Sequence, residues 1–183
     1  MAQKPKLLHS HIIASSRLFT VESMDLEFSN GEQRTYERLV PGGAGAVMMV
    51  AINAHQEVML IKEYGAGIED YTVTLPKGAV DLGESLSEAA NRELKEEIGF
   101  GAREITHLKQ MSLSPSYMKS GIDVMVALDL YPEQLEGDEP EPLEVLTWPL
   151  ADIESLVCRT DFTEGRAIAA LFMARDWYLK QAI

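Results

Sequence analysis

The chain has few basic residues, one cysteine and no long apolar run. Its 183 residues include 16 Lys and Arg against 29 Asp and Glu, so the formal net charge is −13. Nucleic acids and anionic membrane surfaces attract clustered cations, so neither is expected as a partner. The single cysteine, Cys158, excludes an internal disulfide and a cysteine-based zinc framework. No stretch has the length of a membrane span, so we expect a cytoplasmic protein.

The first part of the chain, residues 1–43, is predicted to be a small β extension. The first ten residues show no periodicity, whereas apolar residues alternate from Leu18 onward and again after Asn30-Gly31. Asn-Gly between two such runs is a strong signal for a β-hairpin, because both residues tolerate positive φ. We therefore predict an irregular start, an N-terminal β-hairpin, and a main domain over residues 44–183.

The main domain mixes strand-like and helix-like patterns. Its predicted strands cover residues 46–52, 57–64, 71–75, 105–113, 122–131 and 143–148. Helices are predicted over 86–98, 151–157 and 162–181, the first opened by a Ser85–Glu88 capping box and the third by an Asp161–Glu164 capping box. Cys158, beside the second helix, is expected in the core. This order of elements indicates an α+β fold.

The first of these helices places glutamates on its apolar side. At about 100° per residue, four apolar residues fall on one stripe: Leu86, Ala90, Leu94 and Ile98. With Leu86 at zero, Glu93 and Glu97 fall at about 340° and about 20°, and Glu96 at about 280°. These carboxylates therefore face the protein rather than the solvent.

Carboxylates that are buried one turn apart repel each other and lose hydration, so a positive charge has to balance them. Arg92 and Lys95 are expected to point largely away from the stripe. A divalent cation is the simplest solution, and oxygen ligands suit Mg²⁺ or Mn²⁺. The alternative that stays open is an ion pair with an Arg or Lys from another element.

A motif in this segment resembles a known family. The residues are Gly78, Glu84, Arg92-Glu93-Leu94, Glu96-Glu97 and Gly99-Phe100, and their spacing matches the Nudix box at every fixed position. The resemblance implies the α/β/α sandwich of Nudix hydrolases, with a mixed sheet and Mg²⁺ as cofactor, or Mn²⁺ in its place. It also implies hydrolysis of a nucleoside diphosphate linked to another group, by attack of water on the pyrophosphate.

The likeness to the family also suggests substrates. Pro115 and Tyr117 stand where family members that act on ADP-ribose and on diadenosine polyphosphates carry Pro and Tyr. This implies release of AMP from ADP-ribose, NADH and short diadenosine polyphosphates. Two other interpretations stay open, namely an enzyme restricted to ADP-ribose and a Nudix module that senses nucleotides without turnover.

The resemblance further implies roles for individual residues. The implied metal ligands are Glu93 and Glu97, with Glu96, the carbonyl of Lys77, and Glu141 as additional ones. The implied catalytic residues are Glu93, Glu97 and Glu139, with Glu139 as general base. The implied substrate contacts are Arg38, Lys77 and Tyr117. Glu84 is expected to pair with Arg92, Gly78 to allow a tight loop, and the chain to form a homodimer through its β extension.

Overall fold

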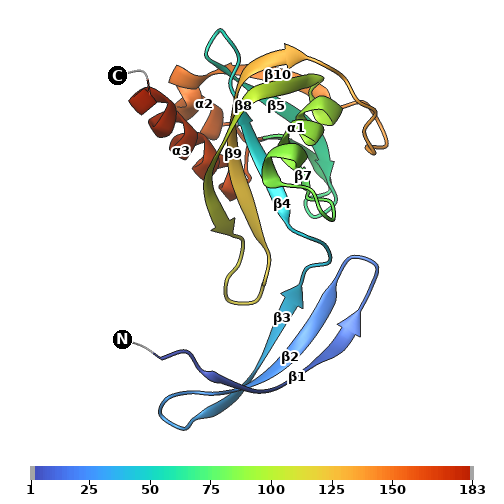
Figure 1. Ribbon diagram of the computed structural model, residues 1–183, viewed down its shortest axis with the longest axis vertical. Helices are drawn as coiled ribbons and strands as arrows, with labels where there is room; N and C mark the ends of the chain where they lie inside the picture. The colour runs from blue at the N-terminus through green and yellow to red at the C-terminus, as the bar shows by residue number, and fades with distance from the viewer. Residues whose placement is uncertain (1–2, 182–183) are drawn as a thin grey trace.

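Residues 3–181 are described by a computed structural model, in which a small N-terminal sheet extends from a layered body (Figure 1). The sheet has the order β1-β2-β3 and is antiparallel, with β1 at Lys6–Ser15, β2 at Thr20–Glu27 and β3 at Gln33–Val40. The predicted hairpin is confirmed, and Gly31 in its turn has φ 81°.

The prediction of an irregular start is wrong over residues 6–10, because β1 pairs with β2 along its length. Residues 3–5 form no strand, and residues 1–2 lie outside the described residues. Register shifts lie between Leu7 and His9 and between Ile12 and Ala14. Each shift interrupts the alternation of side chains between the two faces, so the sequence shows no period of two. The extension is therefore a three-stranded sheet rather than a hairpin alone.

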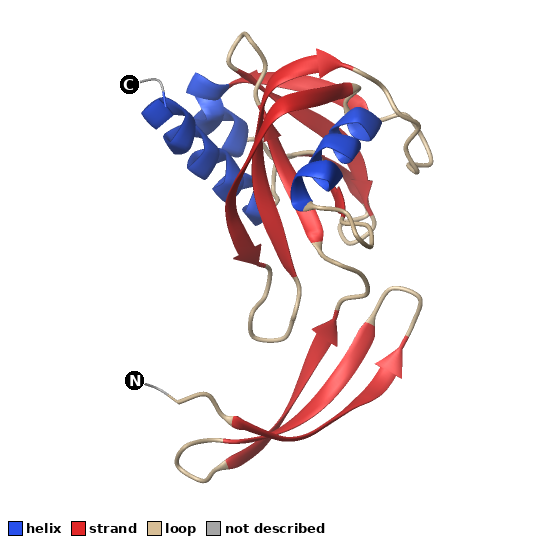
Figure 2. Ribbon diagram, viewed as in Figure 1, coloured by secondary structure: helices blue, strands red, loops and turns tan. Residues whose placement is uncertain are grey.

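The body contains two further sheets, drawn in red in Figure 2. One has the order β7-β4-β9-β8 and the other β10-β5-β6. The strands are β4 (Ala46–Ala51), β5 (Glu57–Gly65), β6 (Asp70–Thr74), β7 (Lys77–Ala79), β8 (Phe100–Ser112), β9 (Gly121–Pro132) and β10 (Glu144–Pro149). β4 and β9 are parallel, whereas the other pairs in these sheets are antiparallel, so the first sheet is mixed.

Helices cover both faces of the β7-β4-β9-β8 sheet (Figure 2). They are α1 (Leu86–Glu97), the short 3-10 turn η1 (Leu150–Asp152), α2 (Ile153–Val157) and α3 (Gly165–Gln181). Met48 and Val50 of β4 pack in the core beneath α2 and α3, whereas Val47 and Met49 pack in the core beneath α1. This α/β/α arrangement confirms the predicted α+β fold.

Two details at the end of the chain differ from expectation. α3 begins at Gly165, so Asp161 does not cap it. The Asp161 carbonyl instead accepts a hydrogen bond from the Val73 amide at 2.8 Å, which docks the preceding segment on β6. Cys158 follows α2 and is exposed, so its predicted core position is wrong.

Two backbone hydrogen bonds join the N-terminal sheet to the body. The Leu39 amide donates to the Tyr117 carbonyl at 2.8 Å, and the Lys119 amide donates to the Leu39 carbonyl at 2.9 Å. Tyr117 and Lys119 belong to the loop between β8 and β9, which reaches toward β3 in Figure 1. In residues 3–181, no helix has both the length and the apolar character needed to cross a membrane.

Candidate metal and catalytic site

Helix α1 has the ends and the buried stripe that its sequence predicts. The Ser85 side chain accepts from the Glu88 amide, and the Glu88 carboxylate accepts from the Ser85 amide, which completes the capping box. Gly99 follows the helix with φ 73°, a conformation that glycine adopts without strain. The residues that α1 turns toward the core are buried, namely Ala89, Ala90, Leu94 and Ile98. The stripe therefore fixes which way the glutamates of α1 point.

Arg92 holds three carboxylates at one side of the site. Its Nη1 donates to Glu93 at 2.8 Å and to Glu96 at 3.0 Å. Its Nε and Nη2 each donate to the Glu84 carboxylate at 3.0 Å, and Nη2 also reaches the Ala79 carbonyl at 2.9 Å. The predicted pair with Glu84 is confirmed, but the expectation that Arg92 points away from the stripe is wrong. The long side chain bends back because the glutamates attract its guanidinium.

These contacts change the protonation of the carboxylates. The guanidinium of Arg92 lowers the pKa of Glu84 and has its own pKa raised in turn. Burial raises the pKa of Glu93, although the hydrogen bond from Arg92 opposes that rise. Arg92 thus supplies positive charge from α1 itself. From the sequence, this charge was expected to come from a metal ion or from a basic residue of another element.

Gly78 leaves the space that the Glu93 carboxylate occupies. A Cβ on Gly78 would lie 1.9 Å from Glu93 Cδ and within 2.1 Å of its oxygens. Gly78 lies in β7, opposite Val47 of β4. The reason for glycine here is therefore a close approach of α1 to the strand rather than the tight loop that we predicted.

Glu97 is the most enclosed carboxylate of the group. The Lys77 amide donates to its Oε2 at 2.9 Å. Burial raises the pKa of Glu97 to about 8, and the nearby charges of Glu93 and Glu63 add to the effect. Burying an ionised carboxylate raises the free energy of the folded protein unless a cation balances the charge, so we expect a cation beside Glu97.

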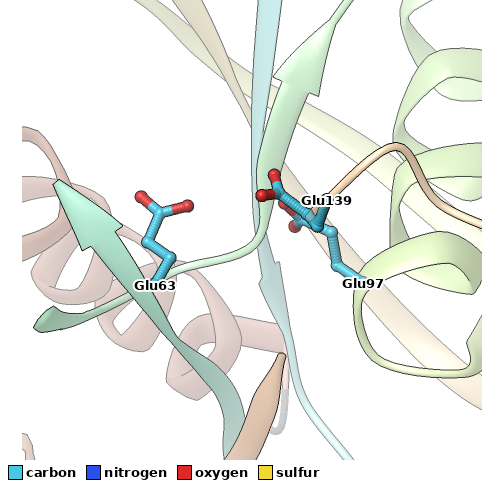
Figure 3. A group of neighbouring side chains, drawn as sticks. All are labelled: Glu63, Glu97 and Glu139. Atoms are coloured by element: carbon cyan, nitrogen blue, oxygen red, sulfur yellow. The ribbon is translucent and has the colours of Figure 1, made fainter. Parts of the chain in front are cut away.

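Three glutamates from different elements converge at this point (Figure 3). Glu63 extends from β5, Glu97 from α1 and Glu139 from the loop before β10, and one oxygen of each lies within 4.8 Å of the other two. The ammonium of Lys77 pairs with Glu63. Burial raises the pKa of Glu139, and the charge of Glu63 raises it further. An all-oxygen cluster of this size is the donor set that Mg²⁺ or Mn²⁺ prefers.

The sequence analysis missed Glu63, although a signal for it exists. Met59, Ile61 and Glu63 alternate along β5, and the first two are buried beneath α1. A strand places every second side chain on the same face. A carboxylate that continues a buried face therefore points into the same interior as the glutamates of α1.

Glu97 and Glu139 of the cluster line a cleft of about 1030 Å³ between α1, β7 and the acidic loop of residues 134–143. Eight acidic side chains line it: Asp81, Glu93, Glu96, Glu97, Glu136, Asp138, Glu139 and Glu141. Lys77 and Arg92 are the basic residues among its lining. A pyrophosphate would be repelled from such a surface, so the cleft fits an anionic substrate only together with divalent cations.

The structure separates the remaining predicted site residues into two groups. Glu96 and Glu141 line the cleft, but Glu96 is bound by Arg92, and Glu141 accepts from the Tyr71 hydroxyl. Arg38 and Tyr117 lie at the N-terminal sheet and its contact with the β8–β9 loop. Neither of these two lines the cleft described for residues 3–181, and their roles as substrate contacts stay predictions.

Comparisons with known proteins agree with this architecture. Residues 5–38 match the model of the NudE-type Nudix hydrolase N-terminal domain, and residues 43–171 match the NUDIX domain. The chain is 54% identical to ADP compounds hydrolase NudE of Escherichia coli (strain K12), over 96% of this chain and 94% of that one. It is 30% identical to ADP-ribose pyrophosphatase of Bacillus subtilis (strain 168), over 91% and 92%.

A solved structure shows the same fold. The crystal structure of an ADP compounds hydrolase superposes with a TM-score of 0.92 at 53% identity, covering 99% of this chain and 97% of that one. Both the N-terminal sheet and the layered body are therefore shared with a solved protein.

Proposed function

Because the chain belongs to the Nudix hydrolase family and is an enzyme of that family, we propose that it hydrolyses ADP-linked compounds at their pyrophosphate and releases AMP. The names of the relatives support this substrate class. We extend it to ADP-ribose, NADH and short diadenosine polyphosphates. The observation that carries the proposal is the convergence of Glu63, Glu97 and Glu139 beside an acidic cleft that Glu93, Glu97 and Glu139 line.

The donor set fits Mg²⁺, which Mn²⁺ can replace. We assign Glu97 and Glu63 as ligands, with Glu93, Glu96, Glu141 and the Lys77 carbonyl as further ones. The bound metal would supply a water of lowered pKa and would neutralise the pyrophosphate oxygens. Arg92 donates hydrogen bonds to Glu93 and Glu96, so it positions both carboxylates for binding the metal.

Glu139 is the general base in this proposal, because its position differs from that of the other two carboxylates in the cluster. Both side chains line the cleft, but Glu97 is half-buried between α1 and β7, whereas Glu139 is exposed on its loop. A base has to reach the attacking water and then release the proton to solvent. Lys77 lines the same cleft and is assigned to contact the substrate phosphate.

The N-terminal sheet leads us to propose a homodimer. Within residues 6–40, Ser23 alone is buried, so the sheet has no hydrophobic core of its own. Three strands need such a core or a covering surface to be stable. A second copy of the chain would cover the sheet and would bring Arg38 and Tyr117 to the substrate of the partner. The lone cysteine suits a reducing compartment, and we place the enzyme in the cytoplasm.

The test is AMP release by the purified protein with Mg²⁺ and with a chelator. ADP-ribose, NADH, diadenosine triphosphate and a plain nucleoside triphosphate are compared at equal concentration. We expect AMP from the first three compounds, with loss of activity in the chelator and in Glu97→Gln and Glu63→Gln. Glu104→Gln changes an exposed glutamate of β8 and serves as the control.

The other outcomes decide between the alternatives. Turnover of ADP-ribose alone would select the narrow ADP-ribose enzyme. Tight nucleotide binding without turnover of any compound would select the sensing module. Full activity of Glu63→Gln, with loss in Glu97→Gln, would remove Glu63 from the metal site.

A further inference from the structure

A second cavity, of about 360 Å³, adjoins the acidic cleft. It lies between β5, β6 and residues 139–144. Glu63 and Glu139 line this cavity and also belong to the carboxylate cluster. The acidic cleft and this cavity share four lining residues, Glu139, Glu141, Pro142 and Leu143, so a molecule whose pyrophosphate is held at the cluster can extend past them into the cavity. Its volume is at the small end of the range for ligand pockets, which suits one ring system rather than a whole nucleotide.

Two tyrosines form the wall of the second cavity. Tyr64 of β5 and Tyr71 of β6 are directly opposite each other in the antiparallel register. Their ring centroids are 5.6 Å apart with the planes at 68°, an edge-to-face contact. The side chains nevertheless stay 55% and 45% exposed, so much of the ring surface is free. Large exposed aromatic rings that already pack against each other form a ready surface for a planar ligand.

The neighbouring side chains hold this surface in place. The Tyr71 hydroxyl donates to the Glu141 carboxylate, and the ammonium of Lys62 lies 6.0 Å from the centroid of the Tyr71 ring. Within the described part of the chain the Tyr64 hydroxyl makes no hydrogen bond, so the Tyr64 ring is less restrained than the Tyr71 ring. Glu139, Glu141 and Glu144 border the cavity and disfavour a further phosphate there.

We propose that Tyr64 and Tyr71 bind, by stacking, the second base of a dinucleotide substrate, either the nicotinamide of NADH or the second adenine of a diadenosine polyphosphate. This inference rests on the proposed function, because the cluster has to hold the pyrophosphate between the two bases. ADP-ribose carries a sugar in place of the second base, so it gains nothing from the two rings. The cavity thus determines which ADP-linked compounds are favoured, while the carboxylates determine the reaction.

The experiment compares KM for NADH, diadenosine triphosphate and ADP-ribose in Tyr64→Ala, Tyr64→Phe and the wild type. Loss of one base–aromatic stack typically weakens binding by roughly tenfold. We expect Tyr64→Ala to raise KM by about that factor for NADH and diadenosine triphosphate, without change for ADP-ribose. Tyr64→Phe keeps the ring and should show the wild-type KM for NADH and for diadenosine triphosphate.

A matched control and a binding measurement complete the test. Leu179 on α3 is also 55% exposed, and Leu179→Ala should leave all three KM values unchanged. NADH fluorescence measures binding with Mg²⁺ in a Glu139→Gln background, which lacks the proposed base and therefore suppresses turnover, and the Kd should rise about tenfold when Tyr64→Ala is added.

The outcomes separate this proposal from the proposed function. Equal changes for ADP-ribose and NADH, or no change for any substrate, would overturn the stacking role. Wild-type turnover restricted to ADP-ribose would also overturn it and would leave hydrolysis intact. If no ADP-linked compound is hydrolysed, the proposed function fails, whereas weaker NADH binding by Tyr64→Ala would still support the subsite.

Discussion

Gly78 and Arg92 decide where the Glu93 carboxylate lies. Gly78 leaves the volume free, and Arg92 supplies the charge that holds the carboxylate in it. Two residues of the motif thus position a third, one by leaving room for its side chain and the other by pairing with its charge. At this scale the functional position of a side chain depends on contacts of a few ångströms, and single substitutions test it directly.

Gly78→Ala should displace Glu93, because the new Cβ would lie 1.9 Å from Glu93 Cδ. The carboxylate is the mobile end of its side chain, so we expect a small change in Tm but a fall in kcat/KM of about 10- to 100-fold. Steady-state kinetics on ADP-ribose measure this. A Cβ on Gly67 meets nothing within 4 Å, so Gly67→Ala is the control. Normal activity of Gly78→Ala would show that Glu93 is not required where it lies.

Glu97→Gln should stabilise the metal-free protein in a pH-dependent manner. Burial raises the pKa of Glu97 from 4.5 to about 8 in the folded state. Between these values the unfolded chain releases a proton that the folded protein retains, so rising pH destabilises the wild type. Glutamine has no such proton and avoids this cost, although the variant should lose activity by about 100-fold or more as a metal ligand is removed.

Melting curves in a chelator measure the effect. Near about pH 5, Glu97→Gln and the wild type should melt at similar temperatures, whereas near about pH 9 the variant should melt about 5 °C higher. Glu104→Gln, on the surface, should follow the wild type at both values. A variant that is less stable than the wild type at high pH would contradict the burial argument.

At the scale of elements, the acidic loop between β9 and β10 is anchored at both ends. At its start, the Glu133 amide donates to the Gly99 carbonyl at 3.0 Å, which ties the loop to the end of α1. At its far end, Glu141 accepts from the Tyr71 hydroxyl. Glu139 lies between these anchors, so its position depends on contacts with two separate elements.

Tyr71→Phe should release the far end of this loop while keeping the aromatic ring. One hydrogen bond contributes about 0.5–1.5 kcal/mol, so we expect kcat to fall by up to about tenfold for every substrate, with little change in Tm. Tyr64→Phe removes a hydroxyl from the neighbouring ring and is the matched control. A change confined to NADH and diadenosine triphosphate would instead assign the Tyr71 hydroxyl to the second base.

At the scale of the whole molecule, the N-terminal sheet is joined to the body by few contacts and leaves β1 exposed along its length. Large apolar side chains on β1 and the turn that follows are exposed: Leu7, Leu8, Ile12, Ile13, Leu18 and Phe19. An exposed apolar strand of this kind is typical of an interface. The body, in contrast, has two buried cores that need no partner.

Ile12→Glu combined with Ile13→Glu should break the proposed homodimer. Both side chains are exposed on β1, so the pair places two charges on the apolar surface that a partner would cover. Sedimentation velocity should show the wild type at about twice the 20.3 kDa of one chain and the variant at about that mass. Leu179→Glu on α3 is the control. If Arg38 acts across the interface, KM for ADP-ribose should rise in the dissociated variant. A wild type that sediments as one chain would overturn the dimer.

What the sequence alone determined are the features that depend on neighbours along the chain. The ends of α1, its buried stripe and the inward direction of its glutamates follow from capping residues and helical periodicity. The Asn30-Gly31 hairpin follows from local backbone preference. The Nudix motif lies mainly on this one helix and the loop before it, which is why the family was predictable.

Only the tertiary structure decided which distant residues meet. Glu63 joins Glu97 and Glu139 because β5 and the acidic loop are placed beside α1 by the packing of the sheets. β1 is a strand because it pairs with β2, and no local sequence pattern predicts this pairing. The bend of Arg92 toward Glu93 and Glu96 reflects Coulomb attraction between side chains, which helical angles alone do not describe. Local rules set each element, whereas burial and charge across elements assembled the site.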